Sequence, residues 1–227
     1  MQPATPLVLF DIDGTLVRKS GPHHREALVE AVRAVTGART TTDDVPLAGM
    51  LDRDILTIMM QRAGLSGRAI KTAMPAIVEH AQQFYSGTCP NLERRVCPGV
   101  RRALAKLQKH GVITGLVTGN LTRIGWTKLE RAGLHTFFRF GAFAEVGKDR
   151  AALVRIALRE ARRQKWITPA SPVSLIGDHP NDINAARANK IRAIAVSTGP
   201  ATYAELAEHS PDIILPDMRA LDLEMLL

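Results

Sequence analysis

The fold of this chain is decided by the stretch Leu7-Val-Leu-Phe-Asp11-Ile-Asp13-Gly14-Thr15-Leu16. Its leading apolar residues predict a buried strand, which ends in two carboxylates two positions apart. Charges of this kind are costly to bury inside a sheet. Because the carboxyl ends of parallel strands open into the ligand crevice of an α/β fold, we expect Asp11 and Asp13 at that edge. Gly14 allows a tight turn that brings backbone amides close to a bound anion.

The second half of the chain alternates short apolar segments with amphipathic ones. The pattern predicts strands at 112–117, 173–176, 191–196 and 212–215, and helices at 122–132, 150–161 and 181–188. Strands separated by helices of this length indicate a parallel sheet with helical crossovers. We therefore predict an α/β fold whose core is a Rossmann-like parallel sheet.

The segment between the first strand and residue 96 has a different pattern. Helical stretches are predicted at 23–35, 52–63 and 66–85, with no convincing strand among them. Residues 1–19 and 96–227 should then form one core domain. Residues 20–95 should form an all-helical domain inserted into that core.

Composition narrows the class of protein. Hydrophobic residues make up 45% of the chain, yet no apolar run approaches the roughly 20 residues that a membrane helix needs. The apolar N-terminal stretch is too short for a signal peptide, and no basic region precedes it. We therefore expect a cytoplasmic protein without a membrane partner. Cys89 and Cys97 are expected to be free thiols with no assigned role.

The net charge of +8 does not by itself indicate a nucleic-acid partner. Basic residues are scattered along the chain, and only the segment 159–165 is dense in them. A solvated helix face explains that segment, and the overall positive charge would attract small anionic molecules. We expect no nucleic-acid partner, and salt-sensitive binding of nucleic acid stays a weak alternative.

Three further segments place polar residues beside the predicted core elements. Thr118-Gly119-Asn120 follows a strand, and by itself such a sequence is usually only a turn. Gly177-Asp178 ends the next predicted strand, with Asp182 four positions after Asp178, a pairing that a helix cap alone does not explain. Between these two segments, Lys148 precedes a predicted helix.

Taken in order, these segments resemble the four signatures of the haloacid dehalogenase superfamily. Asp13 resembles the second aspartate of the phosphatase version of the first signature. The segment 47–53 resembles the specificity loop of phosphoglycolate phosphatase-like members with a helical C1-type cap, although Leu51 stands where those members often have threonine. The resemblance covers the whole chain and implies a phosphatase whose helical insertion is a lid that excludes water and selects the substrate.

The resemblance also implies a role for each matching residue. Asp11 would be the nucleophile, Asp13 the general acid/base, and Lys148 the cation that steadies the nucleophile and the phosphate. The residues that would bind phosphate are Gly14, Thr118, Gly119 and Asn120. Those that would hold Mg²⁺ are Asp11, Asp178 and, through its backbone carbonyl, Asp13. Asp182 would orient Asp178 or Lys148 without contacting the metal.

Two of these assignments have rivals. Lys148 is followed by Asp149 and Arg150 where the commoner form of the signature has a proline, and this leaves Arg150 open for the same role. Lys148 is favoured because its distance to the following helix resembles the family's pattern better. Arg53 is a candidate for meeting a second anionic group of the substrate, although a solvent-facing arginine in the first turn of a helix is an equally good interpretation.

The predicted function is Mg²⁺-dependent hydrolysis of small phosphomonoesters, phosphoglycolate-like or sugar phosphates, through an aspartyl-phosphate. A phosphomutase or a halide-removing hydrolase on the same fold is an alternative, and so is a non-catalytic protein that binds a phosphorylated ligand. Asp13 argues against halide removal, since displacement of a halide needs no acid. The expected partner is a small anionic phosphorylated substrate, and the protein would be a monomer or a homodimer.

Overall fold

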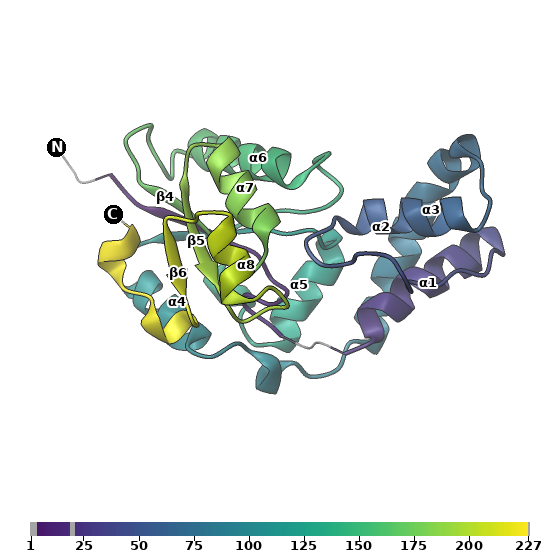
Figure 1. Cartoon of the computed structure of the whole chain (residues 1–227), viewed down its shortest axis with the longest axis horizontal. Coiled ribbons are helices and arrows are strands. Elements are labelled where there is room, and N and C mark those ends of the chain that lie inside the picture. Colours follow the sequence, from purple (N-terminus) through teal and green to yellow (C-terminus); the bar gives the residue numbers. More distant parts are fainter. Residues whose placement is uncertain (1–3, 19–20, 227) are drawn as a thin grey trace.

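A parallel sheet forms the centre of the molecule (Figure 1). The computed structural model describes residues 4–18 and 21–226. The strands pair in the order β3-β2-β1-β4-β5-β6, all parallel, with bounds β1 (Leu7–Phe10), β2 (Ile113–Val117), β3 (Gly141–Ala142), β4 (Val173–Gly177), β5 (Arg192–Val196) and β6 (Ile213–Leu215). β1 is therefore central, and all its side chains are buried, which explains its uninterrupted apolar sequence.

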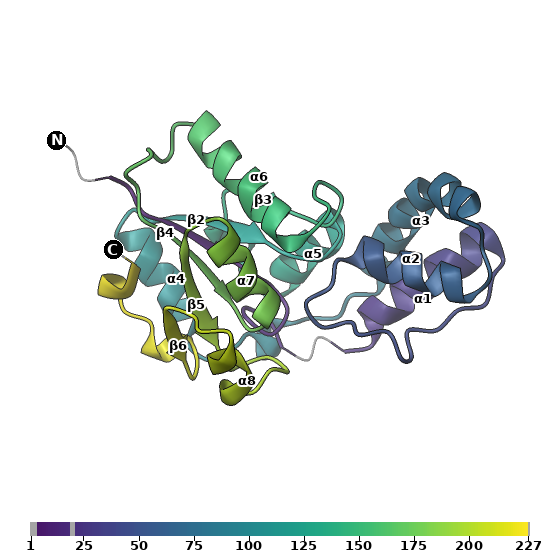
Figure 2. The ribbon, with the colours of Figure 1, turned by 45° about the horizontal axis from the view of Figure 1, so that its top comes forward.

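Helices cover both faces of this sheet (Figure 2). On one face, α6 (Arg150–Arg163) packs against α7 (Pro180–Ala188), and on the other lie α4 (Val100–Lys109) and α5 (Thr122–Arg131). The short helix α8 (Tyr203–Glu208) precedes β6. Each long helix turns an apolar face inward because its apolar residues recur three or four positions apart; in α4 these are Val100, Ala103, Leu104 and Leu107.

The helical insertion lies beside the core, at one end of the molecule in Figure 1. It contains α1 (His23–Thr36), α2 (Asp52–Arg62) and α3 (Gly67–Thr88), and we call these helices and the segments that join them the cap. α1 and α3 pack along each other, and α3 also contacts α5 of the core. The predicted division at residues 19 and 20 lies outside the described residues, and the bounds 20–95 stay a proposal.

The predicted fold class is confirmed, since the core is a parallel α/β sheet and the insertion is helical. The predicted strands and helices are present, with ends that differ by up to a few residues. β3 and α8 were not predicted, because elements of two and six residues are too short to show a period. α4 was also missed, although its apolar stripe is clear. Among the described residues, no helix combines the length and the apolar character needed to cross a membrane.

Candidate active site

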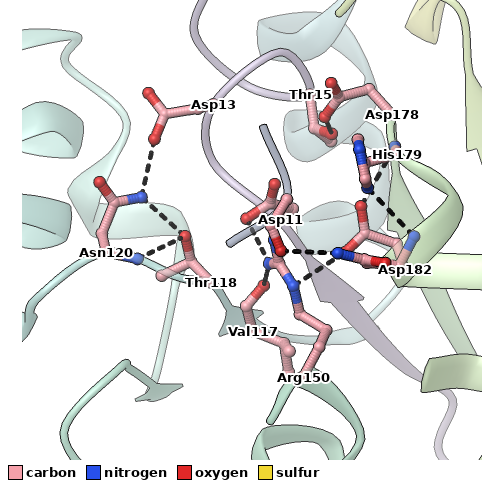
Figure 3. Close-up of polar contacts among 12 residues, drawn as sticks. Asp11, Asp13, Thr15, Val117, Thr118, Asn120, Arg150, Asp178, His179 and Asp182 are labelled. Carbon is pink, nitrogen blue, oxygen red and sulfur yellow. Dashed lines mark hydrogen bonds and ion pairs between the residues drawn. The ribbon is translucent and has the colours of Figure 1, made fainter. Parts of the chain in front are cut away.

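Asp11 and Asp13 lie on the loop that leaves the central strand β1. Because β1 is flanked by β2 and β4, this loop meets the loops that leave those two strands at one edge of the sheet (Figure 3). Gly14 makes the turn with a φ of 83°, and a Cβ there would lie 2.1 Å from Oδ2 of Asp178. Both the turn and the close approach of Asp178 therefore require glycine.

Three carboxylates, one from the loop after β1 and two from the β4–α7 segment, cluster beside β1. Asp11, Asp178 and Asp182 are each at most 5% exposed, and one oxygen of each lies within 4.8 Å of the others. Burial, followed by the charges of Asp11 and Asp182, raises the pKa of Asp178 well above its ordinary value. Burial also raises the pKa of Asp182 to about 7. Crowded carboxylate oxygens of this kind suit a hard divalent cation, which would relieve their repulsion.

A buried arginine provides the positive charge of this cluster. Arg150 is 6% exposed, and its Nη1 lies 2.9 Å from Oδ1 of Asp11 while its Nε lies 3.4 Å from Oδ1 of Asp182. Nη1 also donates a hydrogen bond of 3.2 Å to the carbonyl of Val117. Burial alone would lower the pKa of Arg150, but the neighbouring carboxylates outweigh it and raise that pKa. Arg150 therefore stays cationic.

The preference for Lys148 over Arg150 disagrees with this geometry. Lys148 is exposed, and it forms no hydrogen bond or ion pair with any residue that the structure describes. The reason is where α6 begins: Asp149 caps the helix by accepting a hydrogen bond of 2.7 Å from the amide of Ala152. Arg150 is then the first helical residue and reaches Asp11, whereas Lys148 lies in the loop before the N-cap residue Asp149.

The loop after β2 supplies Thr118, Gly119 and Asn120. Thr118 is fully buried, and Nδ2 of Asn120 donates to its Oγ1 at 2.7 Å and to Oδ2 of Asp13 at 2.8 Å. Figure 3 shows Asn120 between these two side chains. In this arrangement Asn120 holds Thr118 and Asp13 in place, and the Thr118 hydroxyl and the loop amides are left as the groups that can meet a phosphate.

Asp13 has a further partner that the sequence did not suggest. Lys128 on α5 is fully buried, and its Nζ lies 2.7 and 2.6 Å from the two carboxylate oxygens of Asp13. Burial alone would raise the pKa of Asp13, but the Lys128 ammonium, assisted by the hydrogen bond from Asn120, holds it below its ordinary value. The available signal was a lysine on the buried face of α5, four positions after Ile124.

The cap covers this edge of the sheet and encloses a cavity of about 560 Å³. Its polar floor is formed by Asp11, Asp13, Thr118, Gly119, Asn120, Arg150 and Asp178. Apolar cap residues, among them Leu28, Leu47, Met50 and Ile55, form much of its wall, and Arg18 and Arg25 also line it. Arg53 is not among the described residues that line the cavity, because its Nη1 donates instead to the carbonyl of Glu145 at 3.3 Å.

The order and geometry of these residues can now be compared with known proteins. Residues 5–190 match the family model of the haloacid dehalogenase-like hydrolases, so the chain belongs to that family. It is 29% identical to the phosphoglycolate phosphatase of Pseudomonas savastanoi pv. phaseolicola over 95% of this chain and 78% of the relative. It is 28% identical to that of Agrobacterium fabrum over 97% and 92% of the two chains. The predicted family, its phosphoglycolate phosphatase-like character and the predicted class of enzyme, a phosphatase, are confirmed.

Solved structures agree on the fold. A β-phosphoglucomutase from Clostridium difficile superposes with a TM-score of 0.71 at 18% identity, covering 97% of this chain and 94% of the other. CbbY from Rhodobacter sphaeroides, in complex with xylulose-(1,5)bisphosphate, has a TM-score of 0.71 at 19% identity and covers 98% and 99%. At these identities the likeness supports a shared architecture and does not decide between hydrolase and mutase.

Proposed function

We propose that this protein is a Mg²⁺-dependent phosphomonoesterase that acts on small phosphorylated metabolites through a phosphoryl group carried on Asp11. The observation that carries the proposal is the position of Asp11, which lies against the Arg150 guanidinium and beside Asp178 on the floor of a cavity. A carboxylate nucleophile attacking an anionic ester needs positive charge around it. The surroundings of Asp11 supply that charge and the oxygen ligands for a cation.

The donor set supports a hard divalent ion. Asp11 and Asp178, with the backbone carbonyl of Asp13, would hold Mg²⁺, and the ion would neutralise charge on the phosphate during transfer. Asp182 has a different task in this scheme, because its carboxylate already faces Nε of Arg150. It would fix the guanidinium that in turn contacts Asp11.

In the first half-reaction, a carboxylate oxygen of Asp11 attacks phosphorus and the bond between phosphorus and the leaving oxygen breaks. Asp13 donates a proton to that oxygen, so the alcohol leaves uncharged. Thr118 and the loop amides would hold the phosphoryl oxygens, and Arg150 would offset the developing charge. The cap wall would keep bulk water away during this step.

In the second half-reaction, water attacks the same phosphorus while Asp13 accepts a proton from it. The bond between phosphorus and the Asp11 oxygen breaks, and phosphate leaves. Asp13 can reach both the leaving oxygen and the attacking water because its side chain is 42% exposed, while its carboxylate is held from one side. The same residue thus acts as acid first and as base afterwards.

We propose phosphoglycolate-like compounds or sugar phosphates as substrates. The curated relatives named phosphoglycolate phosphatase support this class. A cavity of about 560 Å³ also leaves room for an organic group beyond the phosphate. The expected cytoplasmic location and the monomeric or homodimeric state remain predictions of the sequence.

The test is phosphate release from a panel of small phosphomonoesters, including phosphoglycolate and sugar phosphates, with Mg²⁺ or with a chelator. We expect metal-dependent release that Asp11→Asn abolishes. Isomerised product without free phosphate would instead indicate a mutase. No turnover of any ester by folded protein would favour a non-catalytic role, and halide release from a haloacid would favour the dehalogenase chemistry.

A further inference from the structure

Lys128 is a buried cation that the proposed reaction does not use. It lies on the core helix α5 and is fully buried, and it is absent from the described residues that line the cavity. Burying an ammonium group is costly unless it is paired and hydrogen-bonded. Its partners should therefore explain why a lysine stands there.

The Lys128 ammonium has a complete set of acceptors. Nζ contacts both carboxylate oxygens of Asp13, Oδ1 of Asn120 at 2.7 Å and Nδ1 of His24 at 3.1 Å. It also lies 5.9 Å from the ring centroid of Tyr85. Asp13 and Asn120 belong to the core, whereas His24 and Tyr85 belong to cap helices α1 and α3. Half of the surroundings of Lys128 therefore comes from the cap.

The contacts of His24 extend this link back to the core. An ammonium group only donates, so Nδ1 of His24 accepts from Lys128, and Nε2 carries the proton that faces Oδ2 of Asp52 at 3.0 Å. Oδ2 of Asp52 also accepts from the amide of Leu121 at 2.8 Å, and the amide of Asp52 donates to the carbonyl of Gly119 at 2.8 Å. The chain of contacts leaves the core at Lys128 and returns to it beside Thr118.

The same junction is closely packed. A Cβ built on Gly119 would lie 2.1 Å from the carbonyl oxygen of Met50, so the backbone of the cap segment rests directly on the loop after β2. This contact and the polar chain through His24 and Asp52 form together when the cap is seated on the core. They would be lost together if it moved away.

We propose that Lys128 is a positioning residue that couples the seating of the cap to the orientation of Asp13. The inference rests on the proposed function, because it assigns a role relative to the acid/base of that reaction. With the cap seated, His24 and Tyr85 complete the surroundings of Lys128, and its ammonium fixes Asp13 toward Asn120. Without the cap, Lys128 would face solvent on that side and hold Asp13 less firmly.

The kinetic test uses Lys128→Met, which keeps an unbranched side chain one atom shorter and removes its charge. Since Asp13 acts in both half-reactions, we expect kcat to fall by roughly ten- to a hundredfold with KM within about twofold. Arg131→Met is the matched control, because it removes one positive charge from an exposed position on the same helix. That variant should keep the wild-type kcat.

A double-mutant cycle separates positioning from a general structural effect. If Lys128 acts through Asp13, then adding Lys128→Met to Asp13→Asn should cost less than about a further twofold in kcat. A lysine that merely supports the fold would reduce kcat by the same factor in both backgrounds. Multiplied losses, or a Lys128→Met variant with wild-type kcat, would overturn the proposal.

A second readout needs no substrate. We expect Lys128→Met to speed hydrogen exchange at the amide of Leu121 and in the first turn of α1, with Arg131→Met unchanged. His24→Leu should have the same effect, while His24→Gln, which keeps one acceptor and one donor, should restore most of the protection. Unchanged hydrogen exchange in Lys128→Met would overturn the coupling, whether or not the wild type releases phosphate. A wild type that releases no phosphate would contradict the proposed function, which is a separate result.

Discussion

Asp11 and Asp13 leave the same strand, but different regions of the molecule hold them. Asp11 contacts Arg150 from α6 and neighbours Asp178, so its surroundings are built by the core alone. Asp13 contacts Lys128, whose remaining partners include His24 of the cap. Changes near Asp11 should therefore affect the chemistry whatever the cap does, whereas changes near Asp13 should depend on how the cap is seated.

The largest expected effect is that of Asp11→Asn. The amide has nearly the same shape as the carboxylate but cannot act as the nucleophile, so phosphate release should fall by at least about 10³-fold. Hydrogen exchange at the cap junction should stay as in the wild type, because no cap residue contacts Asp11 among the interactions of the described residues. Turnover within tenfold of the wild type would contradict the role of Asp11.

The next effect concerns the choice between Arg150 and Lys148. Arg150→Met leaves Asp11 and Asp182 buried without their cation, so kcat should fall by about 10²- to 10³-fold and metal-free stability by about 3–5 kcal/mol. Lys148→Met removes an exposed charge and should leave both quantities nearly unchanged. Phosphate release and urea unfolding of the two variants measure this difference. If Lys148→Met lost more activity and stability than Arg150→Met, Lys148 would be the cation that steadies the nucleophile.

Asp178→Asn should separate the stability of the core from its chemistry. The raised pKa of Asp178 means that its ionised form is less favourable in the folded than in the unfolded protein. The protonated form of Asp178 stabilises the folded protein at low pH, and this stability is lost as pH rises through the folded-state pKa. Asparagine at this position is uncharged at every pH and avoids that loss. The metal-free variant should melt above the wild type at neutral pH but lose the Mg²⁺-dependent gain, which is about 2.7 kcal/mol at a hundredfold excess over Kd.

Thermal melting with chelator and with Mg²⁺ checks the Asp178→Asn prediction. Wild-type protein should shift upward on adding Mg²⁺, and Asp178→Asn should not. A variant that melts lower than the wild type without metal would mean that the carboxylate cluster stabilises the fold, contrary to the crowding inferred from its burial.

Gly119→Ala tests the contact between the cap and the loop after β2. Its new Cβ would meet the backbone of Met50, and overpacking of this kind costs about 1–3 kcal/mol, which we expect to appear as weaker seating of the cap. Gly87→Ala on α3 is the control, since a Cβ there meets nothing within 4 Å and should raise stability by up to about 1 kcal/mol. Hydrogen exchange at Leu121 should rise only in Gly119→Ala. Equal exchange in the two variants would argue against a seated cap.

The smallest expected effects concern substrate selection. Arg53 donates to Glu145 away from the cavity, so Arg53→Ala should change KM by less than about twofold. Arg25 lines the cavity, and Arg25→Ala should raise KM about fivefold for substrates with a second anionic group. A larger KM effect for Arg53→Ala would mean that this side chain turns inward when substrate binds.

The sequence predicts which core residues lie close together because the signal there is local. Asp11, Asp13 and Asp178 follow buried strands directly, and a parallel sheet brings the ends of neighbouring strands together. The geometry favours Arg150 over the predicted Lys148 because of where a single helix begins. Asp149 is the N-cap, a residue type that often begins helices, and this shifts the inward-facing cation to Arg150.

The cap half was less predictable because its contacts join residues far apart in the chain. Lys128 and Asp13 are separated by 115 positions, and nothing in either local sequence specifies their pairing. Asn120 matched a phosphate-binding signature, yet its side chain is committed to Asp13 and Thr118. Such pairings depend on how the insertion packs on the core, and spacing along the chain does not encode that directly.

A phosphoryl group carried on Asp11 can be detected directly during turnover. Wild-type protein is mixed with a phosphomonoester that it turns over in Mg²⁺, quenched rapidly in acid and digested, and the peptide that contains Asp11 is examined by mass spectrometry. We expect a transient phosphoryl group on Asp11 that appears before phosphate is released and is absent with chelator. Steady phosphate release with the phosphoryl group on another residue, or with none on Asp11 at any time, would contradict it.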